Sequence, residues 1–265
     1  MDPYDLVKKS DVEVVLRVDK GADATLKSFQ VEDFTAKGDN YACKVTSVVV
    51  QYEKGAKQSK VSYVVKLNPG NEGFAGKMVS DIFEIENIFY SKILPLLDQE
   101  LVNANEPKLR APKYFHCVST RGKEVLYLED LRVTGYKMHN RKDTLDKHHA
   151  DLIVRELARF HASSVLLFSK PEYSIENFGK KFPQISKSYE TMKKNMDESG
   201  IKMLENGLDS AAQLTDQIPE YEYVSKYLRS KIPTIDDEFS EMVKPKAPFI
   251  TLRHGDCWNN NFLFR

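Results

Sequence analysis

The chain has 265 residues, of which 41% are hydrophobic and 29% are charged, and its formal net charge is +0. This length can bury one large core or two lobes, and the composition is ordinary for a globular protein. A neutral chain lacks the basic excess that most nucleic-acid-binding proteins use to neutralise phosphates. We therefore expect no nucleic-acid partner.

The sequence also gives expectations about location and partners. Its N-terminal segment mixes acids and bases from the second residue onward, which is not typical of a secretory signal. No apolar run approaches the length needed to cross a bilayer. The cysteines Cys43, Cys117 and Cys257 are an odd, widely spaced set, which favours a reducing compartment. We expect a cytoplasmic protein with no membrane contact and no obligate protein partner.

The first part of the chain predicts an antiparallel sheet with one long helix. Runs of β-branched and aromatic residues indicate strands, and the first two flank a turn at 54–57. Apolar residues at helical spacing follow the second strand. The expected elements are strands at 41–52, 61–67, 113–118 and 125–128, and a helix from about Met78 to Leu94 that Pro95 ends.

After Asp130 the hydrophobic pattern becomes helical, most clearly from about 145 to 168. A sheet followed by helices predicts an α+β fold in two lobes, at 1–131 and 132–265. The space between two lobes is a common place for a ligand. Further amphipathic segments, also expected to be helices, lie near 186–197, 201–214 and 220–231.

The strongest chemical signal is the polar segment RHGDCWNNNF at 253–262, between two apolar runs that are expected to be short strands. It offers Asp256 and, five residues later, Asn261. Phosphoryl transfer needs such a pair, because a carboxylate accepts the proton of the attacking hydroxyl and an amide oxygen binds Mg²⁺. By composition alone, a turn held by Asx hydrogen bonds explains the segment about equally well. A thiol hydrolase that pairs Cys257 with His254 is disfavoured, because residues so close in a connecting loop rarely face each other.

Lys66 and Glu86 form the second signal. Lys66 lies in a strand that otherwise reads as buried, and Glu86 lies on the apolar stripe of the following helix. Because buried charges need partners, we expect the two side chains to meet. Kinases use such a pair to direct an ammonium at nucleotide phosphates. For either residue alone, a solvated strand-edge Lys or a snorkelling Glu is the better explanation.

Two weaker signals lie in turns. A turn before the first predicted strand could cover phosphates with backbone N–H groups, although its single glycine is also typical of a simple turn. The end of the strand at 125–128 leaves backbone groups that can hydrogen-bond an adenine edge, although by itself it is only an acidic strand end. The residues concerned are Gly38, Asp39 and Asn40 in the turn, and Glu129, Asp130 and Leu131 at the strand end.

Six segments of the chain occur in the order typical of the ecdysteroid kinase-like family, also called CHK kinase-like. This family is related to choline and aminoglycoside kinases. The segments cover nearly the whole chain, which therefore resembles this family and its two-lobed, protein-kinase-like fold. They are KGDNYACKV, VVKLNP, FEIENIFYSKILP, LYLEDL, ELARFHASS and HGDCWNNNFLF, of which the last and the LARFHA helix are the most specific.

The resemblance implies an ATP- and Mg²⁺-dependent kinase whose acceptor is an alcohol group of a small molecule, such as an ecdysteroid. It implies that residues 1–131 form the nucleotide-binding lobe. The turn at 38–41 would cover the phosphates, and residues 129–131 would be the connection beside adenine. By the same resemblance, Lys66 would contact the phosphates, Glu86 would hold Lys66, Asp256 would be the catalytic base, His254 would brace its loop and Asn261 would bind Mg²⁺.

The sequence departs from the family in one respect. Family members continue past the last short strand into an Ile-Asp-Phe-type segment whose Asp binds Mg²⁺, whereas this sequence ends at Arg265. We therefore expect a fragment of a longer product or a shortened form with an incomplete helical lobe. Without that carboxylate, transition-state stabilisation would fall by something on the order of several kcal/mol. A catalytically inactive, kinase-like binding or regulatory protein is the alternative function.

Overall fold

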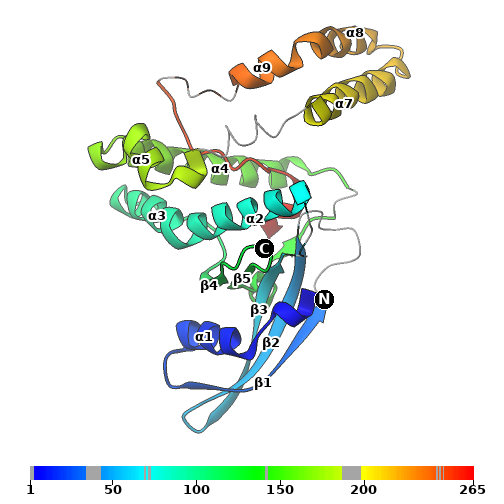
Figure 1. Ribbon diagram of the computed structural model, residues 1–265. Coiled ribbons are helices and arrows are strands. Elements are labelled where there is room, and N and C mark those ends of the chain that lie inside the picture. Colours follow the sequence, from blue (N-terminus) through cyan, green and yellow to red (C-terminus); the bar gives the residue numbers. More distant parts are fainter. Residues whose placement is uncertain are drawn as a thin grey trace. The chain divides into compact units, whose positions relative to one another are not determined.

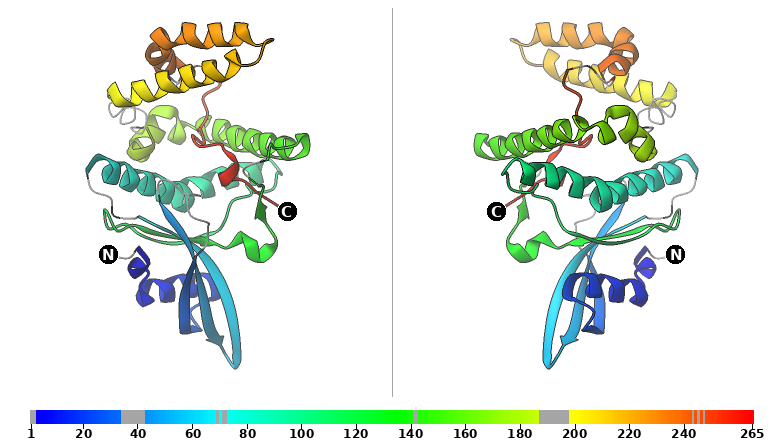
Figure 2. Two further views of the ribbon diagram at one scale, coloured as in Figure 1. Left: turned by 90° about the vertical axis from the view of Figure 1, so that its right-hand side faces the viewer. Right: turned by 90° about the vertical axis from the view of Figure 1, so that its left-hand side faces the viewer.

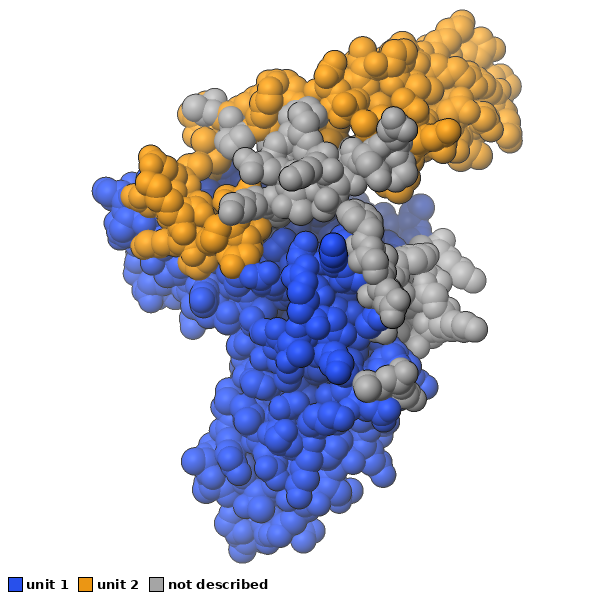
Figure 3. Space-filling view, viewed as in Figure 1, with its two compact units in different colours: residues 1–174, 251–265 blue, residues 175–250 orange. Residues whose placement is uncertain are grey.

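The computed structural model describes residues 3–33, 43–68, 70, 73–140, 143–186, 198–242, 244, 246 and 248–265. By their internal contacts they form two compact units (Figure 3), of which the first comprises residues 1–174 and 251–265 and the second residues 175–250. The lobe boundary expected near residue 131 lies inside the first unit and stays a prediction.

The first unit is built on a five-stranded antiparallel sheet with the order β1-β2-β3-β5-β4 (Figure 1). The four predicted strands are present, and β2 and β3 form the predicted hairpin. An additional strand, β1, pairs along the free edge of β2. The strands are β1 (Ala24–Asp33), β2 (Lys44–Lys54), β3 (Lys57–Leu67), β4 (Tyr114–Val118) and β5 (Val125–Glu129).

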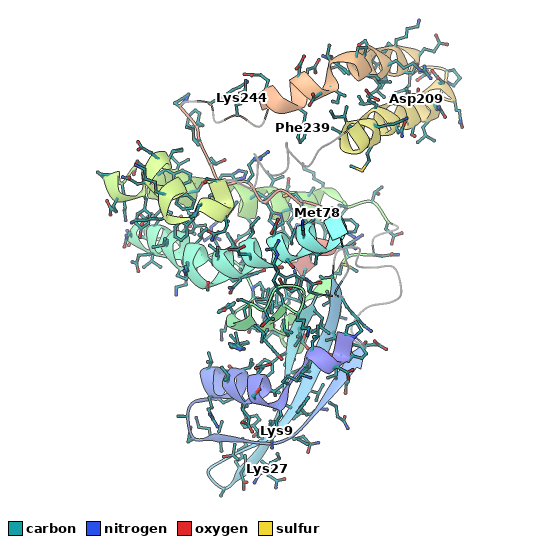
Figure 4. All side chains as sticks on the ribbon, viewed as in Figure 1. Lys9, Lys27, Met78, Asp209, Phe239 and Lys244 are labelled. Atoms are coloured by element: carbon teal, nitrogen blue, oxygen red, sulfur yellow. The ribbon has the colours of Figure 1, made fainter. Side chains whose placement is uncertain are left out.

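Helices α1 (Lys9–Lys20) and α2 (Gly73–Ile88) lie on opposite faces of this sheet (Figures 1 and 2). In Figure 4, Lys9 on α1 and Lys27 on β1 lie at the end of the sheet remote from Met78 on α2. Each helix covers its own hydrophobic core, because successive strand residues point to opposite faces. The α1 core includes Val12, Val15, Leu16, Val65, Leu67, Val125 and Tyr127, and the α2 core includes Val79, Phe83, Leu126 and Leu128.

The long helix does not end at Pro95, so that prediction is wrong. From α2 the chain continues through a π-helical turn, η2 (Phe89–Ile93), into α3 (Leu94–Asn103). Pro95 therefore lies in the first turn of α3, where a proline is tolerated because N–H groups there need no acceptor within the helix. Ser91 donates through Oγ to the carbonyl oxygen of Asn87 at 2.6 Å, which supplies a side-chain partner inside this irregular stretch.

Helix α4 (Lys147–Phe168) confirms the helix predicted at 145–168, and Asp146 caps it by accepting from the His149 N–H. The last residues of the chain return to this helix. Leu252 donates its N–H to Ser164 Oγ at 3.1 Å, and β7 (Leu263–Phe264) pairs with β6 (Lys137–Met138). The strand expected at 249–252 is absent, because this segment bonds to a helix side chain instead of a neighbouring strand.

The second unit consists of helices. α7 and α8 pack against each other and confirm the helices predicted at 201–214 and 220–231, whereas the helix expected near 186–197 lies almost wholly outside the described residues. No helix in the described parts of the chain is long and apolar enough to cross a membrane. The helices are α5 (Ile175–Lys181), α7 (Glu198–Asp216), α8 (Glu222–Lys231) and α9 (Ile235–Met242).

Short helical turns complete the described chain, and with them the α+β fold is confirmed, with an antiparallel sheet in the first part and mainly helices after it. This arrangement is consistent with a two-lobed, kinase-like fold. The turns are η1 (Pro3–Leu6), η3 (Leu131–Thr134), η4 (Pro171–Tyr173), η5 (Ile232–Thr234) and η6 (Asn259–Asn261).

Candidate functional site

Strand β3 and helix α2 bring Lys66 and Glu86 together. The Nζ of Lys66 lies 2.5 Å from the Oε1 of Glu86, and 27% and 20% of the two side chains are exposed. Lys66 faces α2 because its neighbours Val65 and Leu67 point into the core on the other side of the sheet. The expected pairing is therefore confirmed, and it is partly open to solvent.

The surroundings keep Lys66 charged. Burial lowers the pKa of the ammonium, but the charge of Glu86 and its hydrogen bond more than compensate. The pKa of Lys66 is therefore above its ordinary value. Tyr90 and Cys43 are its other electrostatic neighbours. Burial raises the pKa of Tyr90 to about 12 and also raises the pKa of the Cys43 thiol. At neutral pH, Lys66 therefore faces one carboxylate and two uncharged groups.

Sequence reasoning missed Tyr90 and Cys43. Tyr90 follows Glu86 by four residues, so the helical spacing alone could have placed both on one face. Cys43 lies two residues before Val45, which is the β2 partner of Lys66. Its position could not be read from the sequence, because it depends on the register of the β2–β3 hairpin.

The polar loop at 253–262 is fixed at both ends. Its start is held on α4 by the bond from Leu252 to Ser164, whose side chain is fully buried. Its end passes through η6 into β7, which pairs with β6. Between them, Asn259 donates through Nδ2 to the carbonyl oxygen of His139 at 2.9 Å. The loop is thus tied to the segment that follows the sheet as well as to α4.

Inside the loop, Asp256 and Asn261 are in direct contact. Asn261 donates through Nδ2 to Asp256 Oδ2 at 2.7 Å and to the Asp256 carbonyl oxygen at 2.8 Å. The Asp256 N–H donates to His254 Nδ1 at 3.3 Å. Gly255 has φ +82°, and a Cβ there would touch nothing within 4 Å, so the left-handed backbone and not lack of space favours glycine. Asp256 and Asn261 are exposed.

The charges of Lys66 and Glu86 act on His254 in the loop. Desolvation lowers the pKa of His254, Asp256 opposes this shift, and the charges of Lys66 and Glu86 also act on the imidazole, lowering and raising its pKa respectively. Because such effects fall off steeply with distance and screening, His254 lies near the ion pair. The structure therefore brings the two strongest sequence signals to one region of the first unit.

Cys257 belongs to the same loop but does not have the environment of a nucleophilic thiol. Desolvation and the neighbouring Asp256 raise its pKa, whereas reactive cysteines have a lowered pKa. The described hydrogen bond of His254 goes to the Asp256 backbone. These contacts agree with the rejection of a thiol hydrolase.

The strand end at 129–131 is partly occupied by internal bonds. The Glu129 N–H donates to the Lys113 carbonyl oxygen at 2.8 Å. The Asp130 carboxylate, 3% exposed as a residue, accepts from Ser62 and Arg132, which lowers its pKa against the opposing effect of burial. The Leu131 N–H is the first of η3 and has no partner within that helix. Any adenine contact here must therefore use backbone groups, since the Asp130 side chain is engaged.

The predicted phosphate-covering turn, with Gly38, Asp39 and Asn40, lies outside the described residues. Its role stays a prediction.

The oxygen atoms of the loop fit a divalent cation that arrives with a nucleotide. In the described residues, no three His, Cys, Asp or Glu side chains are placed to hold a metal by themselves. Mg²⁺ at nucleotide sites is commonly held by one or two carboxylates together with phosphates and waters. Asn261 offers its Oδ1 for such a cation, because it contacts Asp256 through Nδ2.

Comparison with known families agrees with this geometry. The model of the ecdysteroid kinase-like family matches residues 37–265. The chain belongs to this family. Neither the search of curated proteins nor the search of solved structures gives a significant match. For this ecdysteroid kinase-like chain, membership supports kinase-type chemistry on small molecules, and the matched range includes Lys66, Glu86 and the whole loop at 253–262.

Proposed function

We propose that the chain is an ATP-dependent phosphotransferase whose acceptor is an alcohol group of a small molecule. The observation that carries this proposal is the 2.5 Å contact of Lys66 with Glu86, together with the action of both charges on His254 in the Asp256 loop. Phosphoryl transfer uses a charged ammonium at the phosphates, a carboxylate near the acceptor hydroxyl and an oxygen ligand for the metal ion.

In this proposal each residue has one task. Lys66, held by Glu86, binds phosphate oxygens of ATP through its ammonium. Asp256 accepts the proton of the acceptor hydroxyl while the hydroxyl oxygen bonds to the γ-phosphorus of ATP. The bond from that phosphorus to the β–γ bridging oxygen breaks, which releases ADP. His254 supports the Asp256 backbone through Nδ1.

Asn261 is the residue of the loop that would hold Mg²⁺, through its Oδ1. Bound there, the ion would neutralise charge on the transferring phosphoryl group. Backbone groups at 129–131, and the turn at 38–41, complete the nucleotide site by family resemblance. Ecdysteroids are the first acceptors to test, because the family description names them, and related hydroxylated compounds follow.

The proposed location is the cytosol. Cys43, Cys117 and Cys257 are free thiols, as is usual in a reducing compartment.

The test combines binding with turnover. Purified protein is titrated with ATP and Mg²⁺ by calorimetry, and phosphate transfer from radiolabelled ATP to a panel of small alcohols is then measured. We expect ATP binding that Lys66→Met weakens, and transfer that Asp256→Asn lowers by orders of magnitude. ATP binding without transfer to any acceptor would favour the alternative, an inactive kinase-like binding or regulatory protein. Absence of ATP binding would overturn both.

A further inference from the structure

A hollow of about 520 Å³ lies beside the polar loop at 253–262, in the first unit. It is lined by the segment after the sheet, by the first turns of α4 and by the two residues Phe264 and Arg265. None of the side chains assigned above to nucleotide or proton transfer lines it. Its chemistry is therefore separate from that of the Lys66–Asp256 region.

Aromatic rings form part of the wall of this hollow. The rings of His139 and His149 lie 4.8 Å apart at an angle of 67°, and the ring of His149 lies 4.6 Å from that of Phe264 at 85°. Leu152 adds an aliphatic surface. Such edge-to-face contacts fix the rings, so the hollow offers a flat, largely apolar body a preformed surface.

Two permanent cations lie at the same hollow, Lys137 and Arg265. The Arg265 guanidinium lies 5.1 Å from the centre of the Tyr136 ring, and its aliphatic stem packs over Gly135, where a Cβ would lie 3.7 Å from Cδ. The guanidinium is thus oriented by an aromatic face. A held guanidinium binds carboxylates and sulfonates well, because its N–H groups match two oxygens at once.

One acidic side chain next to the hollow, that of Asp146, is already engaged with His149. The Asp146 carboxylate accepts both from the His149 backbone N–H and from His149 Nδ1, each at 2.8 Å. It therefore orients the His149 ring and caps α4. The lining contains no Asp or Glu side chain, and in the 265-residue chain the α-carboxylate of Arg265 offsets only one of the two positive charges.

From these contacts we propose that the hollow binds a small anionic ligand with a flat apolar body, of the aromatic carboxylate or sulfonate class. The rings of His139, His149 and Phe264 receive the body, and Lys137 and Arg265 receive the acidic group. The hollow is linked to the polar loop at 253–262, because Asn259 of that loop donates through Nδ2 to the carbonyl oxygen of His139.

The test uses the 265-residue chain, naphthalene-2-sulfonate as the probe and histidine ¹H–¹³C NMR at constant pH. We expect saturable shifts of the His139 and His149 signals, which are assigned by His→Gln variants. His116 and His161, which do not line the hollow, serve as internal controls. The neutral analogue naphthalene-2-methanol is expected to bind roughly tenfold more weakly or worse, because it lacks the charge.

Variants separate the charge effect from general apolar binding. The double variant Lys137→Met with Arg265→Met is expected to weaken sulfonate binding by about tenfold or more. Lys147→Met, in the first turn of α4 but outside the lining, is expected to leave sulfonate binding unchanged. Unchanged His116 and His161 signals show that each variant is folded. Equal affinity for the neutral analogue, or sulfonate binding unaffected by the double variant, or no shift of His139 and His149, would overturn the proposal.

Discussion

Lys66 and Glu86, twenty residues apart in the sequence, are joined by a 2.5 Å contact between a strand and a helix. The contact ties α2 to the sheet at a point where both side chains keep some exposure to solvent. Tyr90 and Cys43, the other electrostatic neighbours of Lys66, are uncharged at neutral pH, and burial raises the pKa of each.

Breaking this pair is expected to destabilise the protein. Removing one partner of a fully buried ion pair costs about 3–5 kcal/mol, and here the exposure of both side chains reduces the expected cost to about 1–3 kcal/mol. Urea unfolding of Lys66→Met, Glu86→Gln and the double variant measures this. The double variant should lose less than the sum of the single ones, and strict additivity would mean that the contact contributes nothing.

His254 is expected to titrate below the ordinary histidine pKa of about 6.5. Because Lys66 disfavours the imidazolium and Glu86 favours it, Lys66→Met should raise the pKa and Glu86→Gln should lower it further. NMR titration of the His254 ring checks both signs. A His254 pKa that neither variant moves would place the loop away from the ion pair.

The same shift predicts a pH dependence of stability. With the pKa of His254 lower in the folded than in the unfolded state, the unfolded chain binds more protons as the pH falls below about 6.5. Stability attributable to this group is therefore fully present above that pH and decreases as the pH falls toward the folded pKa. Urea unfolding of His254→Gln and of the unsubstituted protein at pH 5 and pH 7.5 isolates this contribution. The loss of unfolding free energy between pH 7.5 and pH 5 should be smaller in the variant.

Asp256→Asn is expected to lower phosphate transfer by about 10²–10⁴-fold, which is the usual contribution of a general base, while ATP affinity changes little. Asp151→Asn provides a matched control, because Asp151 is exposed on α4 and lies outside the site. Steady-state turnover and calorimetric ATP binding are measured on both. Normal transfer by Asp256→Asn would remove Asp256 as the base.

Gly255→Ala is expected to cost about 1–2 kcal/mol, because its φ of +82° is unfavourable for residues with a Cβ. It should also reduce turnover, since Gly255 sets the direction of Asp256. Gly207 lies inside α7 with nothing within 4 Å of an added Cβ, so Gly207→Ala should stabilise by up to about 1 kcal/mol. Thermal unfolding of the pair checks the opposite signs.

Much of the sheet and its ion pair could be predicted, because the information was local. The β-branched runs predicted β2 and β3, and a charged residue inside each of two apolar patterns predicted that Lys66 and Glu86 would meet. The strand β1 was missed because its sequence, ATLKSFQVED, alternates weakly and only one of its ten residues is buried. Edge strands show less hydrophobic patterning, since one side has no neighbour.

Other features depend on contacts that a local pattern does not contain. The strand expected before His254 does not form, because Leu252 bonds to Ser164 on a helix far away in the sequence. The bonds of the Asp130 carboxylate with Ser62 and Arg132 also depend on the folded sheet, whereas the adenine contact expected from the backbone at 129–131 stays a prediction. The proximity of His254 to Lys66 depends on how α4 and the paired strands β6 and β7 hold the loop, which no spacing rule gives.

The π-helical turn at Phe89–Ile93 separates two stretches of helix with different duties. Upstream, Glu86 must point at the sheet, and downstream, α3 must lie against α4. An α-helix advances 100° and 1.5 Å per residue. One wide turn therefore changes the direction in which the side chains of α3 point relative to those of α2. Shortening this turn by a single residue would leave every functional side chain in the sequence and yet swing the carboxylate of Glu86 off its lysine.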